Sequence, residues 1–393
     1  MNHRIALTVL FAAVLCAASS ARADFASCVS GLRSAAARHG VSAATFDAQV
    51  GALQPNMEVI GFLDDQPEFK TAIYDYLAVL VDNERVSDGR ARMGEWASAL
   101  TTAQSRYGVD KYTIAAVWGV ESDFGKGFGK RPIIQSLATL SCFGRRQEFF
   151  RGELFAALQI VEHGDVDPNH FIGSWAGAFG HTQFMPSTFL RNAVDLDGDG
   201  KRDVIDSVPD ALGSTANYLK KGGWVTGQVW GFEVIAPAGY SGPTGRGNKK
   251  AMSSWAAQGF ARAAGGSLGE GSAGLLMPAG RNGPAFLVTR NFDAIYSYNA
   301  AESYALAIAL LSDRLRGGGP LVTPWPVSDR GLSRAERREL QALLKQHGYE
   351  IEKIDGVIGT KSRQAIADYQ GKIGAARDGR PSASVLEALK AGK

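Results

Sequence analysis

Long apolar runs, net charge and cysteine are all scarce in this 393-residue sequence. Beyond the N-terminal segment, no apolar stretch reaches the length of a transmembrane helix, so no internal membrane span is expected. The 42 Lys+Arg and 39 Asp+Glu residues nearly balance, whereas a nucleic-acid-binding protein usually carries a basic face. The composition therefore gives no support to a nucleic-acid partner.

The one apolar run of note opens the chain and predicts export. Residues 1–23 contain Arg4, an apolar run from Ile5 to Ala18, and the small-x-small sequence Ala21–Ala23. This is the pattern of a cleaved signal peptide. Cleavage removes two arginines and no acids, so 40 basic and 39 acidic residues remain, a formal charge of about +1. We expect a soluble exported protein without a transmembrane anchor; an uncleaved anchor is the alternative.

The cysteines point to one disulfide. Of the three, Cys16 lies within the predicted signal peptide, which leaves Cys28 and Cys142. An even count in an oxidising compartment favours a bond between them. Two buried free thiols are the alternative.

Hydrophobic spacing predicts a mainly helical α+β body over residues 24–316, and the hydrophobic fraction of 45% supports two or more domains. Apolar residues recur at helical spacing in 149–161 and 301–315, whereas 230–235 and 285–288 are more typical of strands. Between them, Gly and Ser crowd residues 239–274. That composition predicts irregular or exposed structure.

A Gly/Pro-rich segment follows this body. Residues 317–331 begin with Gly-Gly-Gly-Pro, continue through Pro-Trp-Pro and show no hydrophobic periodicity. Flexible glycines followed by stiff prolines are typical of an interdomain linker. Residues 332–393 then form a compact module, with helices expected from Ser333 to about His347, from Lys361 to Tyr369, and after Pro381.

Glu121 is the candidate catalytic carboxylate. Asp110 is a plausible N-cap for a helix that runs to Glu121 without a charge between Lys111 and Glu121. Apolar residues three, four and seven positions earlier share its face. Desolvation and the negative end of the helix dipole both disfavour the carboxylate, so we predict a protonated group that can act as a general acid. A structural glutamate paired with a buried arginine is the alternative. Asp123 would point away from it on a continuing helix.

Three blocks in the body resemble the lytic transglycosylase B family. They are the stretch around Glu121 (VWGVESDFG, 117–125), a second block (GSWAGAFGHTQFMPS, 173–187), and SYN (297–299) followed by YALA (304–307). They keep the family's order and approximate spacing.

The resemblance implies a lysozyme-like helical body around a glycan groove. It also implies a periplasmic, monomeric enzyme that acts on peptidoglycan strands. It implies cleavage of the β-1,4 bond between N-acetylmuramic acid and N-acetylglucosamine without water, leaving a 1,6-anhydro ring, with Glu121 as the single acid/base and no catalytic cofactor. The positions that it assigns to the sugar-binding groove are Ser174, Gln183, Tyr298, Asn299 and, from spacing alone, Tyr76. A hydrolytic muramidase and a non-catalytic peptidoglycan-binding protein are the alternatives.

An acidic loop over residues 195–206 (DLDGDGKRDVID) fits an EF-hand pattern. The predicted metal-binding positions are Asp195, Asp197, Asp199, Lys201, Asp203 and Asp206. An aspartate at the last position is shorter than the usual glutamate, so sodium could replace calcium. We expect a structural calcium ion; a metal-free acidic turn is the alternative.

The C-terminal module resembles the small three-helix peptidoglycan-binding domain of cell-wall hydrolases. The resemblance rests on ELQALLKQHGY (339–349), IDGVIGT (354–360), AIADYQ (365–370) and the Asp378-Gly379 turn. Such a module would raise the local concentration of substrate. A helical domain for another partner is the alternative.

Overall fold

The computed structural model describes residues 24–64 and 71–392, and the predicted signal peptide lies outside them. The described chain is mainly helical and divides into two compact units. The first contains residues 24–64, 96–107 and 121–218, and the second contains 71–95, 108–120 and 219–392. Within these ranges no helix combines the length and the apolar character that a membrane crossing requires.

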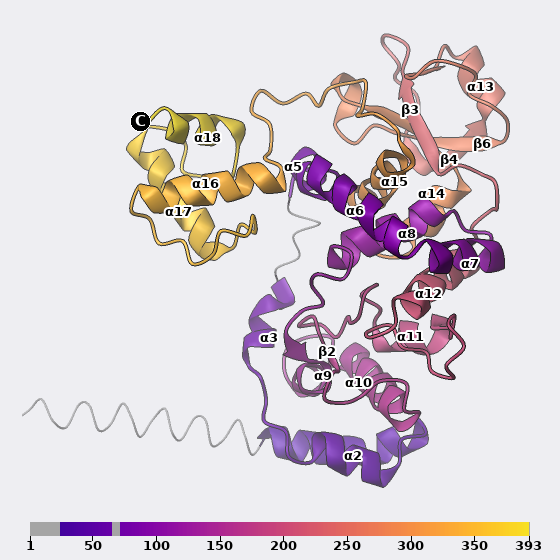
Figure 1. Ribbon diagram of the computed structural model, residues 1–393, viewed down its shortest axis with the longest axis vertical. Coiled ribbons are helices and arrows are strands. Elements are labelled where there is room, and N and C mark those ends of the chain that lie inside the picture. Colours follow the sequence, from indigo (N-terminus) through magenta and orange to yellow (C-terminus); the bar gives the residue numbers. More distant parts are fainter. Residues whose placement is uncertain (1–23, 65–70, 393) are drawn as a thin grey trace, which may run out of the picture. The chain divides into compact units, whose positions relative to one another are not determined.

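The first unit is built mainly from helices (Figure 1), and aromatic and aliphatic side chains form its core. Helix α10 (Gln147–Glu162) contains the predicted helical stretch 149–161 and packs against α9 (Ile133–Cys142). The elements of this unit are the helical residues 24–38, α2 (Ala43–Val50), α3 (Glu58–Gly61), η1 (Phe62–Asp64), α7 (Ala97–Tyr107), β1 (Arg131–Pro132), α9 (Ile133–Cys142), α10 (Gln147–Glu162), β2 (Ile172–Gly173) and α11 (Pro186–Asn192).

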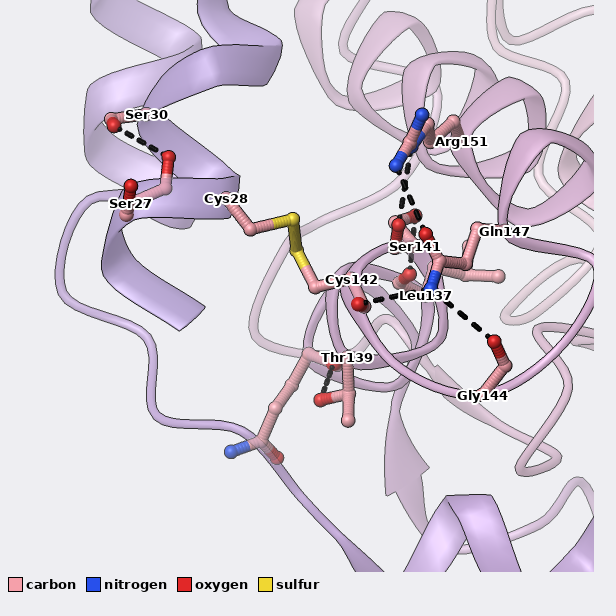
Figure 2. The surroundings of a disulfide bond; sticks show 11 residues. Ser27, Cys28, Ser30, Leu137, Thr139, Ser141, Cys142, Gly144, Gln147 and Arg151 are labelled. Atoms are coloured by element: carbon pink, nitrogen blue, oxygen red, sulfur yellow. Dashed lines mark hydrogen bonds between the residues drawn. A yellow bond between two sulfur atoms is a disulfide. The ribbon is translucent and has the colours of Figure 1, made fainter. Parts of the chain in front are cut away.

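The predicted disulfide is confirmed. Cys28, in the helical residues 24–38, is bonded to Cys142 at the end of α9, and 114 positions of sequence separate them (Figure 2). Side chains from α10 satisfy the last carbonyls of α9: Arg151 Nε donates to the Ser141 carbonyl at 3.1 Å, and Gln147 Nε2 donates to that of Cys142 at 3.1 Å. The end of α9 is thereby held where the disulfide needs it.

The second unit contains a five-stranded antiparallel sheet in the order β4-β6-β7-β3-β5. The predicted strands 230–235 and 285–288 correspond to β3 (Gly231–Ile235) and β7 (Ala285–Val288), which pair in the middle of the sheet. The other strands are β4 (Gly245–Ala251), β5 (Ala261–Arg262) and β6 (Ser272–Leu276), with α13 (Met252–Ala257) and η2 (Gly280–Asn282) between strands.

The prediction of irregular or exposed structure over residues 239–274 is only partly right, because this range also contains β4, α13, β5 and the start of β6. The prediction of exposure holds for β4, an edge strand none of whose seven residues is buried. Without a buried face the strand has no need of alternating apolar residues, so the sequence carries no period-2 signal.

Helices make up the rest of the second unit. The predicted helix 301–315 is α15 (Glu302–Arg316), which packs against α5, α6 and α14. The ranges of these partners are α5 (Ile73–Leu80), α6 (Asn83–Glu95) and α14 (Arg290–Tyr296). Two further helices, α8 (Lys111–Ser122) and α12 (Val208–Lys221), begin in one unit and end in the other.

The C-terminal module folds as predicted into three helices (Figure 1), which enclose an apolar core of their own. They are α16 (Arg334–Gln346), α17 (Thr360–Lys372) and α18 (Ala383–Lys390). Ser333 and Glu336 form a capping box at the start of α16, at the residue where the sequence predicted this helix to begin. Tyr369 and Ile366 of α17 are almost fully buried in the core.

Candidate active site

The helix that carries Glu121 begins as the sequence predicts. Asp110 Oδ2 accepts the backbone N–H of Thr113 at 3.1 Å, and the Asp110 carbonyl accepts that of Ile114, so Asp110 is the N-cap of α8. The apolar residues before Glu121 are fully buried: Ile114, Val117 and Trp118. Glu121 itself is partly exposed in the last turn of the helix.

The expectation that α8 continues through Asp123 is wrong. The helix ends at Ser122, and Asp123 and Phe124 both adopt the left-handed region, with φ of 52° and 57°. Ser122 secures the turn, because its Oγ donates to the His181 carbonyl at 2.6 Å and accepts the Gly125 N–H at 3.1 Å. The end of α8 is therefore tied directly to the second sequence block.

That second block is a tight loop stabilised by its own polar residues. Ser174 N donates to the Ala178 carbonyl at 2.8 Å, and the Ala178 N–H returns to Ser174 Oγ at 3.0 Å. Gln183 Nε2 donates to the carbonyls of Gly180 at 2.9 Å and Phe128 at 3.3 Å. Both side chains are partly exposed. They are thus held in fixed positions in the same unit as Glu121.

The remaining predicted sugar-binding residues belong to the second unit. Tyr76 lies on α5, and Tyr298 and Asn299 follow α14. The Tyr298 ring stacks on that of Tyr304 in α15, with centroids 6.3 Å apart and 24° between the planes. Tyr76 and Tyr298 are partly exposed, and Asn299 is exposed.

Residues other than glycine with a positive φ cluster at these motifs. Among the described residues, five that are not glycine have a positive φ, and four of them lie in or beside the three blocks: Asp123, Phe124, Gln183 and Ala300. Such conformations cost about 1–3 kcal/mol each and persist where the surrounding structure holds them, often at functional sites. The strain therefore marks the same places as the sequence motifs.

Glu153 is a buried carboxylate of the first unit with a structural role. Its Oε2 accepts the Ser187 N–H at 2.9 Å, and its Oε1 accepts the Ser187 hydroxyl at 2.7 Å. Ser187 is in the first turn of α11, where backbone N–H groups lack helical partners. Both oxygens of Glu153 thus stabilise a helix start, which makes it a structural carboxylate.

The acidic loop brings four carboxylates together, and one of them was not predicted. Oxygen atoms of Asp195, Asp197, Asp199 and Asp210 lie within 4.8 Å of one another. Asp210 is fully buried and accepts N–H groups from Leu196, at 2.7 Å, and from two other residues of the loop. Burial raises the pKa of Asp210 to about 6. Hard oxygen donors at this density suit a divalent cation such as calcium.

Of the other predicted metal-binding positions, Asp203 and Asp206 are not part of this carboxylate group. Asp203 Oδ1 accepts backbone N–H groups of its own turn, at 2.7 Å from Ile205 and 2.9 Å from Asp206. Asp206 Oδ2 lies 3.4 Å from His170 Nδ1. Lys201 donates its N–H to Asp199 Oδ1 at 2.8 Å. Sequence spacing pointed to Asp206 because it stands at position 12, whereas Asp210, four residues later, lies in the first turn of α12.

The second unit also contains a cavity of about 1060 Å³, which no sequence pattern predicted. Leu321, Val322 and Trp325 of the linker line it together with Trp230 and Phe232 of the sheet region. Of the described residues that line it, none is a predicted catalytic, sugar-binding or metal-binding residue.

Two family models match the chain. A model described as transglycosylase SLT domain matches residues 24–313. A peptidoglycan binding domain matches residues 333–389. The predicted linker, residues 317–331, falls within the gap between the two matches, residues 314–332.

Known proteins resemble the chain over much of its length. Membrane-bound lytic murein transglycosylase B of Escherichia coli K12 is 35% identical over 235 residues, or 59% of this chain and 64% of that protein, so the match spans less than two thirds of this relative. The structure of SltB3 from Pseudomonas aeruginosa in complex with NAG-anhNAM-pentapeptide is 44% identical, with a TM-score of 0.75, and covers 93% of this chain and 99% of the other. Escherichia coli Slt35 in complex with calcium is 31% identical, with a TM-score of 0.64, over 75% of this chain and 92% of the other.

Proposed function

This chain belongs to the transglycosylase SLT domain family, and from that premise we propose that it is a lytic transglycosylase of peptidoglycan. The proposed reaction breaks the β-1,4 bond between N-acetylmuramic acid and N-acetylglucosamine and forms a 1,6-anhydromuramic acid end. The observation that carries it is Glu121 in the last turn of a buried apolar helix, inside a motif shared with this family.

Glu121 has both acid and base roles in this proposal. Its carboxyl group donates a proton to the glycosidic oxygen as the C1–O bond breaks, and N-acetylglucosamine leaves with a free hydroxyl. The carboxylate then takes the proton of the muramyl C6 hydroxyl as O6 bonds to C1. The proton returns to Glu121 and no water is consumed, so one carboxyl group suffices, whereas most hydrolytic glycosidases use two.

The polar residues of the motifs would orient the sugar. Ser174 and Gln183 are fixed by hydrogen bonds within their loop, so their placement costs little entropy on binding. Tyr298, held by stacking on Tyr304, offers an aromatic face and a hydroxyl. We assign these residues, together with Asn299 and Tyr76, to substrate binding.

The C-terminal domain and the acidic loop have supporting roles. Residues 332–393 would bind peptidoglycan and keep the catalytic body, residues 24–316, near its substrate. The four clustered carboxylates would hold a structural calcium ion, and a calcium complex of a 31% identical protein supports this choice of ion. A signal peptide over residues 1–23 would direct the protein to the periplasm, where its substrate lies.

Mass spectrometry of digested sacculi tests the reaction. Purified chain lacking residues 1–23 should release muropeptides whose muramyl ends are lighter by one water than reducing ends, because ring closure replaces hydrolysis. Hydrated reducing ends would identify a muramidase instead. Release of neither product, from protein that binds sacculi, would identify a non-catalytic binding protein.

A further inference from the structure

One carboxylate, that of Asp82, caps two helices from different parts of the sequence. Its Oδ1 accepts the N–H of Arg85 in the first turn of α6 at 2.7 Å. Its Oδ2 accepts the N–H of Arg334, the first residue of α16 in the C-terminal domain, at 2.9 Å. Asp82 and Arg334 are both buried, at 8% and 9% exposure. Since each helix start presents unpaired N–H groups and positive charge, a shared carboxylate stabilises both.

Arg85 continues this connection from α6 to α8. Its side chain is buried at 6% exposure, and Nη1 donates a short hydrogen bond to the carbonyl of Gly119. Gly119 is in the last turn of α8, two residues before Glu121. The helix stops at Ser122, so carbonyls of this turn need partners from outside the helix. A guanidinium group supplies both the donor and a positive charge at the negative end of the helix.

We propose that Asp82 and Arg85 are positioning residues that couple docking of the C-terminal domain to the placement of Glu121. A continuous hydrogen-bonded chain runs from the first N–H of α16, through Asp82 and the first turn of α6, to the last turn of α8. The C-terminal domain thus sets the rate of cleavage as well as the residence of the enzyme on its substrate. This inference rests on the proposed role of Glu121.

Other ion pairs hold the same domain in place but do not lead to α8. Arg380 makes a bidentate pair with the buried Asp75, at 2.7 and 2.8 Å. Arg338 pairs with Glu84 at 2.5 Å. Glu84 stands on α6 one residue before Arg85, so Arg338→Gln removes a contact of the same interface while leaving the chain through Asp82 intact. It is therefore the matched control.

The test compares full-length variants on soluble glycans of a few disaccharide repeats, where surface residence plays no part. Asp82→Ala and Arg85→Met should each lower kcat about tenfold or more with KM changed less than twofold, since small displacements of a catalytic group affect the chemical step. Arg85→Lys should recover part of kcat, because it restores a cationic donor. The kcat of the double variant should be no lower than that of the less active single variant. Arg338→Gln should keep the wild-type kcat.

Amide hydrogen exchange provides a readout that does not depend on activity. In Asp82→Ala, peptides that cover residues 117–124 should exchange faster than in wild type, and in Arg338→Gln they should not. Unchanged kcat in folded Asp82→Ala, losses that multiply in the double variant, or equal loss in Arg338→Gln would overturn the coupling. If the wild type itself leaves glycans uncut, the proposed function fails, and unchanged exchange over 117–124 would then overturn the coupling separately.

Discussion

Glu233 on strand β3 binds the linker at Thr323: its Oε1 accepts the Thr323 N–H at 2.7 Å, and its Oε2 accepts the N–H of the preceding Val322 at 2.8 Å. A segment whose composition is typical of a flexible tether is therefore anchored at its middle. The anchor also shapes the cavity that the linker lines.

Glu233→Ala should release this part of the linker. Two charge-assisted hydrogen bonds at a partly exposed site contribute on the order of 2 kcal/mol to local stability. Hydrogen exchange at the amides of Val322 and Thr323 should accelerate accordingly. Glu270→Ala, a change at an exposed carboxylate of the same unit, is the control, and equal acceleration in both variants would remove the role assigned to Glu233.

Glu121→Gln should fold normally and lose glycan cleavage by at least about a hundredfold, because the amide cannot donate a proton to the leaving oxygen. Clearance of a purified peptidoglycan suspension measures the loss. Asp123→Asn is the control: it keeps a residue type that tolerates the left-handed backbone at this position, and it should retain most activity. Near-normal clearance by Glu121→Gln would refute the assignment.

Loss of the disulfide should destabilise the protein strongly. Because the bond closes a loop of 114 positions, the chain-entropy model gives a contribution of roughly 4–5 kcal/mol. Denaturant unfolding of Cys28→Ser/Cys142→Ser against wild type measures it. Thiol titration of the unreduced, denatured wild type should find no free thiol among these two cysteines, and two reactive thiols would contradict the bond.

Calcium should raise the melting temperature, and a chelator should lower it, because an ion bound only by the folded state stabilises that state. At a concentration of about 100 Kd the gain is about 2.7 kcal/mol. Asp210→Asn should abolish this calcium-dependent shift, whereas Asp206→Asn should retain most of it, since only Asp210 lies in the carboxylate group. If Asp206→Asn abolished the shift and Asp210→Asn retained it, the ion would bind at the positions of the EF-hand pattern and not at the observed carboxylate cluster.

Acid should weaken the C-terminal domain through Glu336. Its hydrogen bond with Arg330, followed by those with Ser333, lowers the pKa of Glu336 from 4.5 to about 2. A lowered folded-state pKa stabilises the fold above pH 4.5, and that stability is lost as the pH falls toward 2. Since Arg330 is exposed to solvent, we expect a loss of about 1–2 kcal/mol. The melting temperatures of wild type and Glu336→Gln should converge at low pH. A difference between them that stays constant with pH would contradict this prediction.

The sequence by itself determined the features that depend on neighbouring residues. The N-cap at Asp110, the start of a helix at Ser333 and the helical periodicity of 301–315 all depend on residues within a few positions of the chain, so their patterns could be interpreted directly. Glu121, Ser174 and Gln183 became candidates through the resemblance of the three sequence blocks to a known family. The two cysteines could be paired because only one pairing was possible.

Only the tertiary structure decided the features that depend on residues distant in sequence. Spacing favoured Asp206 over Asp210 because a pattern cannot show how α12 folds back on the acidic loop. Nothing local marked Asp82 or Arg85, because their partners, Arg334 and Gly119, lie 252 and 34 positions away. A carboxylate can cap a helix from another domain only after folding has brought both helix starts within hydrogen-bond distance of it. Sequence patterns cannot predict such a contact, because the partners are far apart along the chain.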